Sequence, residues 1–168
     1  MQTFVPFPEI QKSAAVLDDK RLGKQRVEAM QILNALACTN EKSRGWKNHP
    51  ATVMWKGYRS GLVFYTYCMV WQWKFWGFQD SVESFLDGAY HEDLIQAKQF
   101  RRRGISWQKL VEDKILPPWF GGPIHSTHRS ALLAKDPIHY SQFGWEEIPT
   151  IQYFWPVDVS QANNLTHP

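Results

Sequence analysis

Residues 18–37 read DDKRLGKQRVEAMQILNALA, and they are the strongest secondary-structure signal in the chain. Asp18 or Asp19 is a suitable N-cap for a helix that continues to about Ala37. Advancing ~100° per residue gathers one set of apolar side chains within about 80° of Leu22. These are Ala29, Met30, Leu33, Leu36 and Ala37. The stretch therefore predicts a long amphipathic helix with one buried face.

Further helices are expected on both sides of this stretch. Asn48-His49-Pro50 combines a capping residue with an early-helix proline, and it precedes a second long segment over 51–76 in which Gly57 and Gly61 are expected to cause kinks. Shorter helices are expected over 9–16, within 80–104, after Ser106 and over 126–134. The polar stretch 39–47 is expected to form a loop, and 150–154 is a possible short strand.

These patterns together predict an all-α, compact single-domain helical bundle over residues 1–168. The segment 80–120 is expected to be an insertion, and 145–168 an irregular, aromatic-rich C-terminal tail. Hydrophobic residues make up 43% of the chain and charged residues 21%, which excludes a disordered tail or a fibre. The tryptophans of the 51–76 segment are spread over too much of the helix circumference to belong to a single core face. That helix is therefore expected to be buried on several sides, at the centre of the bundle.

Several features predict a cytoplasmic protein. Cys38 and Cys68 are too few for a disulfide framework and favour a reducing compartment. The first residues lack the basic and apolar regions of a signal peptide. The longest apolar stretch, 61–78, is interrupted by Gln72 and Lys74, so no membrane span is expected.

Charge is distributed unevenly along the chain. Residues 1–60 hold ten Lys/Arg and five Asp/Glu, whereas residues 61–168 hold nine and eleven, so the balances are +5 and −2. This asymmetry indicates an anion-binding face, with nucleic acid as the first candidate, although a chance distribution explains the charge equally well.

The flank of the first long helix carries groups suited to catalysis. Arg21, Gln25 and Glu28 lie together at i, i+4 and i+7, with Lys24 beside them. A carboxylate flanked by cations and amides at the edge of a core is typical of a catalytic acid or base, and equally of a surface salt bridge. Arg26 falls inside the apolar stripe, where its guanidinium requires a carboxylate, carbonyl or phosphate partner.

The order of short motifs resembles the phage-type pyrimidine-dimer DNA glycosylases, which are also abasic-site lyases. The matching segments are LGKQRVE at 22–28, NHPATV at 48–53, VFY at 63–65, WGF at 76–78 and RSALLAKDPIHY at 129–140. The resemblance covers most of residues 1–145 and is weak over 80–120 and beyond 145.

The resemblance implies a compact helical enzyme that excises a damaged pyrimidine, cyclobutane dimers in particular, and then cleaves the abasic strand. In that family the protein's N-terminal amine attacks the sugar, forms a Schiff base and enables β-elimination, assisted by a glutamate. On this chain these groups correspond to the α-amine of Met1 and to Glu28. Gln2 is bulky, so Met1 is expected to be retained, and Val27 stands where the family has an arginine.

The expected partner is double-stranded DNA containing damaged pyrimidines, bound by a monomer without metal or cofactor. Lys and Arg side chains would bind phosphates, and aromatic side chains would fill the gap left by an extruded nucleotide. The candidate DNA-binding residues are Gln2, Arg21, Lys24, Gln25, Arg26, Lys42, Arg44, Trp46, Lys47, His49, Arg129 and Lys135. The spacing of His125 and His128 does not fit a metal site, and His49 and His128 are expected to cap a helix or bond within the core.

Two other functional classes remain open. One is a DNA-binding relative of the family without catalysis, and the other is a helical protein-interaction module that uses its aromatic surface.

Overall fold

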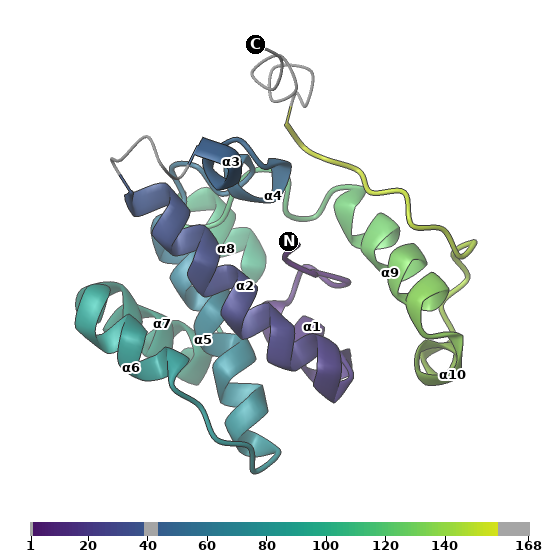
Figure 1. Cartoon of the computed structure of the whole chain (residues 1–168), viewed down its shortest axis with the longest axis horizontal. Coiled ribbons are helices and arrows are strands. Elements are labelled where there is room, and N and C mark those ends of the chain that lie inside the picture. Colours follow the sequence, from purple (N-terminus) through teal and green to yellow (C-terminus); the bar gives the residue numbers. More distant parts are fainter. Residues whose placement is uncertain (1, 39–43, 158–168) are drawn as a thin grey trace.

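The computed structural model describes residues 2–38 and 44–157. Every regular element within these ranges is a helix (Figure 1). The α-helices are α1 Ile10–Val16, α2 Asp19–Ala37, α3 Arg44–Lys47, α4 Pro50–Val53, α5 Arg59–Phe75, α6 Val82–Ala89, α7 His91–Arg103, α8 Trp107–Glu112, α9 Ile124–Lys135 and α10 Pro137–Tyr140, and a 3₁₀ turn follows at Ser141–Phe143. The predicted all-α fold is confirmed, and the described residues contain no strand.

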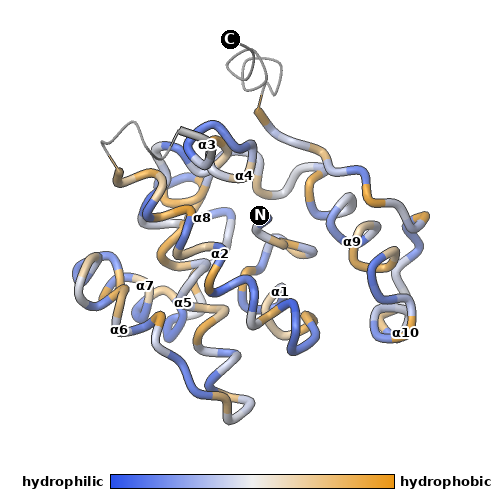
Figure 2. Tube along the Cα trace, in the orientation of Figure 1, coloured by the Kyte–Doolittle hydropathy of each residue, from blue (hydrophilic) through white to orange (hydrophobic). Residues whose placement is uncertain are grey.

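Helix α2 forms as the sequence predicts. Asp18 is the N-cap, and its side chain accepts a hydrogen bond from the Arg21 amide at 3.0 Å. Leu22, Ile32 and Leu33 are buried on the face that packs against α5. Figure 2 shows that the first turns of α2 are mostly hydrophilic and its last turns more hydrophobic, so the charged residues concentrate at its N-terminal half.

Helix α5 lies at the centre of the helical core. It packs against α1, α2 and α7, and Leu62, Tyr65 and Met69 are fully buried. A Cβ at Gly61 would lie 2.2 Å from the Ile115 carbonyl oxygen. Only glycine therefore allows the segment after α8 to approach α5 so closely.

The predicted continuous segment 51–76 is divided into two helices. Helix α4 ends at Val53, and Gly57 in the turn that follows adopts φ = +86°, a left-handed conformation that redirects the chain before α5 begins at Arg59. The predicted loop at 39–47 also differs, because residues 44–47 form the single turn α3. Residues 39–43 lie outside the described ranges.

The possible strand at 150–154 is absent, and the backbone amides at both ends of this segment bond to side chains of α9. The Thr150 amide donates to Ser130 Oγ at 3.1 Å, and the Phe154 amide donates to Thr127 Oγ1 at 3.3 Å. The segment 144–157 is irregular and aromatic, as predicted.

The N-terminal segment, residues 2–7, has no helical structure and lies between the α1/α2 side of the molecule and α9 (Figure 1). Thr3 and Val5 are fully buried, and Gln2 and Phe4 are each 6% exposed. Residues 2–5 are thus part of the core. No helix in the described ranges is long and apolar enough to cross a membrane.

Candidate active site

Side chains from α2 and α9 hold the backbone of the N-terminal segment. The Gln2 amide donates to Glu28 Oε2 at 3.1 Å, and the Phe4 amide donates to Gln25 Oε1 at 2.7 Å. From the other side, the Val5 amide donates to His128 Nδ1 at 2.9 Å. These bonds fix residue 2 beside the Glu28 carboxylate.

The same segment receives further support from the core. The Tyr65 hydroxyl lies 2.7 Å from Gln25 Oε1 and 3.0 Å from the Phe4 carbonyl oxygen. Trp55 Nε1 donates to Thr3 Oγ1 at 2.9 Å. Because the groups that bind it come from separate parts of the chain, the position of the segment depends on the whole fold.

The two histidines of α9 bind Val5 as neutral rings. The Gly121 amide donates to His125 Nε2 at 2.9 Å, so His125 Nδ1 carries the proton that it donates to the Val5 carbonyl oxygen at 2.7 Å. Burial lowers the pKa of His125. Burial, with His125 nearby, lowers the pKa of His128 to about 3. Val5 is therefore held at its amide by His128 and at its carbonyl by His125.

An open pocket of about 410 Å³ lies where the N-terminal segment meets α2. It is lined by Gln2, Phe4, Lys20, Arg21, Lys24, Gln25, Glu28, Lys135 and Tyr153. Lys20, Lys24 and Lys135 are exposed. The pocket thus combines one carboxylate with several cations, an arrangement suited to an anionic ligand.

Glu28 is the acidic group in this pocket. Its Oε2 accepts from the Gln2 amide and, at 3.3 Å, from Gln25 Nε2. Both donors hold the carboxylate in a fixed orientation next to the beginning of the chain. Met1, the predicted nucleophile, lies outside the described residues; its α-nitrogen is joined to the Gln2 nitrogen by three covalent bonds. A carboxylate in this position is suited to accept and return a proton.

Of the two arginines of α2 that were predicted to bind DNA, only Arg21 lines the pocket. Arg21 lines the pocket, but it also pairs with Asp18 at 2.7 Å and with Asp136 at 3.6 Å. Arg26 pairs instead with Asp80, and its guanidinium lies 4.6 Å from the Trp73 ring centre. Arg26 therefore has the carboxylate partner that its place in the apolar stripe requires, and it does not line the pocket.

Of the two predicted DNA-binding residues of α9, only Lys135 lies at the pocket. Lys135 lines the pocket at the end of the helix. Arg129 does not line it: its Nε donates to Glu147 at 2.7 Å and its Nη1 to the Pro6 carbonyl oxygen at 2.8 Å. Arg129 thus ties α9 to the N-terminal segment and to the C-terminal segment.

The predicted aromatic and basic group near α3 is only partly described. Trp46 is 51% exposed, and its ring centre lies 5.9 Å from that of His49. His49 caps α4 by accepting from the Ala51 amide at 3.1 Å. Lys47 is half-buried. Lys42 and the side chain of Arg44 lie outside what the structure describes.

Sequence reasoning missed the part of the pocket that comes from the C-terminal segment. Tyr153 lines the pocket, and its ring centre lies 6.2 Å from that of Phe4. Trp155 continues this aromatic contact to His49, with ring centres 6.1 Å apart. The concentration of aromatic residues in 144–157 was the available signal, but nothing local indicates which core residue they contact.

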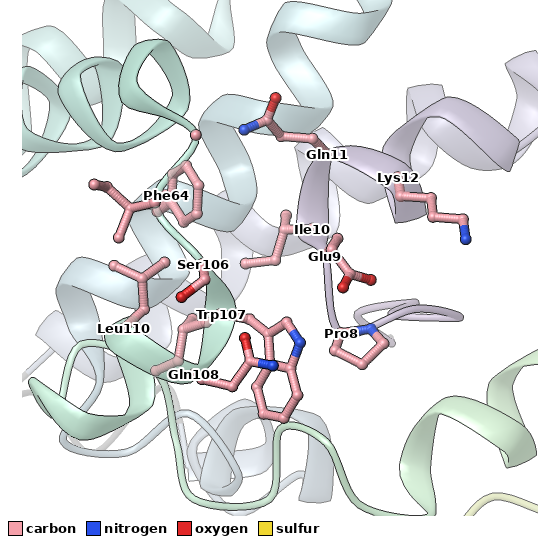
Figure 3. A pocket seen from close by; sticks show the side chains of 13 residues that line it. Pro8, Glu9, Ile10, Gln11, Lys12, Phe64, Ser106, Trp107, Gln108 and Leu110 are labelled. Atoms are coloured by element: carbon pink, nitrogen blue, oxygen red, sulfur yellow. The ribbon is translucent and has the colours of Figure 1, made fainter.

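A second open pocket, of about 440 Å³, shares no residue with the first. Figure 3 shows that it lies between the start of α1 and α8, with Ile10 pointing toward Phe64 and Lys12 pointing away. The Lys12 ammonium lies 3.9 Å from the Phe7 ring centre. Because this pocket presents few charged groups, the Glu28 pocket is the stronger candidate for chemistry.

Within the described ranges, no three His, Cys, Asp or Glu residues are placed to hold a metal ion.

A family model described as pyrimidine dimer DNA glycosylase matches residues 1–84, half of the chain. The chain belongs to this family. The match contains Gln2, Gln25 and Glu28 and extends through α5 into α6. The part of the Glu28 pocket formed by Lys135 and Tyr153 lies outside the match. No curated protein and no solved structure matches the chain.

Proposed function

We propose that this protein excises pyrimidine dimers from double-stranded DNA and then cleaves the resulting abasic strand, using the α-amine of Met1 as nucleophile and Glu28 as its acid and base. The proposal rests on family membership and on one contact, the 3.1 Å hydrogen bond from the Gln2 amide to Glu28. This contact keeps residue 2 next to a carboxylate in a pocket lined by cations.

An N-terminal amine is suited to this reaction. Its pKa is ~7.7–8.0 in model peptides, so a useful fraction is neutral at physiological pH, whereas a lysine requires a pKa lowered by several units. The amine attacks C1′ of the sugar, the damaged base departs, and the Schiff base that forms acidifies a C2′ proton. Loss of that proton and of the 3′ phosphate completes β-elimination. Glu28 accepts the amine proton and later moves the C2′ proton.

DNA binding is assigned to the exposed cations around the pocket. Lys20, Lys24 and Lys135 line it, and their proposed role is to contact the phosphates that flank an extruded nucleotide. Trp46 and Lys47, together with Lys42 and Arg44, are proposed as a second contact with DNA. Arg21 contributes positive charge to the pocket while it remains paired with Asp18.

Borohydride trapping tests the covalent step. The protein is incubated with a duplex containing one cyclobutane dimer, or one abasic site, in the presence of the reductant. We expect a stable protein–DNA adduct, with the peptide that begins at Met1 identified by mass spectrometry as the modified one. An adduct on a lysine would refute the role of the α-amine. Normal DNA binding with no adduct would favour the non-catalytic relative, and no DNA binding would favour the protein-interaction module.

Glu28→Gln tests the carboxylate with little change in shape. We expect cleavage of the abasic duplex to fall by about 100-fold or more, because general acid–base catalysis contributes that much in typical enzymes. The matched control is Gln31→Glu, which introduces a charge change on an exposed position of the same helix. Cleavage by Glu28→Gln at the native rate would rule out the proposed role.

A further inference from the structure

The side-chain amide of Gln2 has an unused donor at the edge of the Glu28 pocket. Gln2 is only 6% exposed and lines the pocket. Its Nε2 atom is buried and has no hydrogen-bond partner among the described residues. A buried donor without a partner is unfavourable in a folded protein, so its retention requires an explanation.

The orientation of this amide is determined by its neighbour. The Thr3 amide donates to Gln2 Oε1 at 2.9 Å. Exchanging the oxygen and nitrogen would bring two donors together, so the unpartnered atom is the nitrogen. Any group that satisfies it must therefore be a hydrogen-bond acceptor.

The position of Gln2 restricts the acceptor further. The cations that suit phosphate oxygens, Lys20, Lys24 and Lys135, are exposed at the pocket, whereas Gln2 is buried and neutral. The backbone nitrogen of Gln2 is itself bonded to Glu28. An acceptor at Gln2 Nε2 thus binds a residue whose backbone contacts Glu28, and the base-side oxygen nearest to the glycosidic bond is the carbonyl oxygen at C2 of the pyrimidine.

We propose that Gln2 Nε2 donates a hydrogen bond to the C2 carbonyl oxygen of the damaged pyrimidine as that base leaves. This role rests on the proposed function. The bond between the amine nitrogen and C1′ forms while the bond between C1′ and N1 breaks. The electron pair of the broken bond stays on the pyrimidine, shared between N1 and the C2 oxygen, and the proton lost by the amine passes through Glu28 to the departing base. A donor at the C2 oxygen stabilises the charge that develops there.

The proposal predicts that Gln2 acts in base release only, because an abasic site has no base to leave. We expect the loss of base-release rate in Gln2→Met to exceed the loss of strand-cleavage rate at a preformed abasic site by about 10- to 100-fold. Gln2→Glu is the companion variant, because it removes the donor but keeps an acceptor for the Thr3 amide. Both rates are measured under single-turnover conditions on duplexes of one sequence, one with a cyclobutane dimer and one with an abasic site.

Lys24→Met is the comparison for a group that contacts DNA without touching the base. We expect it to lower both rates similarly at subsaturating enzyme. Equal losses of both activities in Gln2→Met and Gln2→Glu would overturn the proposal, since Gln2 would then only position the N-terminal segment. Unchanged base release would overturn it as well. If the wild type cleaves abasic DNA and the Gln2 variants release the damaged base at the wild-type rate, only this inference is refuted. If the wild type forms no trapped adduct with either duplex, the proposed function is refuted and this inference with it.

Discussion

Gln25 is the side chain that connects the core to the candidate catalytic carboxylate. Its oxygen accepts from the Phe4 amide and lies 2.7 Å from the Tyr65 hydroxyl, while its nitrogen reaches Glu28. One buried amide thus positions both the N-terminal segment and the acidic group. Sequence periodicity placed Gln25 beside Glu28 on the helix, but the buried contacts to Phe4 and Tyr65 became visible only in the folded protein.

Replacing Gln25 with leucine is expected to affect both stability and activity. The substitution leaves the Phe4 amide and the Tyr65 hydroxyl without their shared acceptor, so we expect the free energy of unfolding to fall by about 2–4 kcal/mol. Gln31→Leu on the exposed face of α2 is the control, with an expected change within about 0.5 kcal/mol. Urea denaturation measures both. Equal stability of the two variants would contradict the importance of the buried amide.

Single cations around the pocket determine how salt affects DNA binding. Lys24→Met removes one exposed charge that lines the pocket, so we expect the slope of log K against log salt to decrease in magnitude by about 1. Lys109→Met is the control, because Lys109 lies on α8 and pairs with Asp113 at 2.8 Å. Fluorescence anisotropy with an abasic duplex at several salt concentrations gives both slopes. Identical slopes would exclude Lys24 from the DNA contact.

Gly61 in α5 and Gly88 in α6 are both helical glycines, but only Gly61 lies where a neighbouring segment leaves no room for a side chain. A Cβ at Gly61 of α5 would meet the Ile115 carbonyl oxygen at 2.2 Å, whereas a Cβ at Gly88 of α6 would meet nothing within 4 Å. We expect Gly61→Ala to lower the unfolding free energy by at least about 1–3 kcal/mol through overpacking. We expect Gly88→Ala to raise it by up to about 1 kcal/mol, because alanine favours a helix over glycine. Thermal unfolding that shifts both variants in the same direction would contradict this packing.

The connection between the helical core and α9 should depend on pH. His128 is neutral in the folded protein, with a pKa lowered to about 3, while an unfolded histidine has a pKa of ~6.5. The unfolded chain therefore binds more protons between these values. Stability is fully present above pH ~6.5 and is lost as the pH falls toward about 3, by as much as ~1.4 kcal/mol per pH unit.

Urea denaturation between pH 7 and pH 4 measures this dependence, with His128→Asn as the matched variant. An asparagine oxygen is able to accept from the Val5 amide but does not titrate, so we expect a shallower decline of stability with decreasing pH. Burial also lowers the pKa of His125, which leaves a remaining dependence in the variant. Parallel pH profiles for the wild type and His128→Asn would show that His128 is not the group responsible.

Local sequence signals accounted for most of the helices, although not for α3 or for the break between α4 and α5, and for the position of Glu28 within α2. The Asp18 cap, the apolar stripe of α2 and the Ser106 cap of α8 are readable because each depends on residues within a few positions of one another. The pocket itself was not readable in this way. The Val5 amide bonds to a histidine 123 residues away, and Arg26 meets Asp80 at a separation of 54. Periodicity carries no information on such distant pairs. Only the packing of the helices determines that the N-terminal segment lies beside Glu28 and that Tyr153 lines the same pocket.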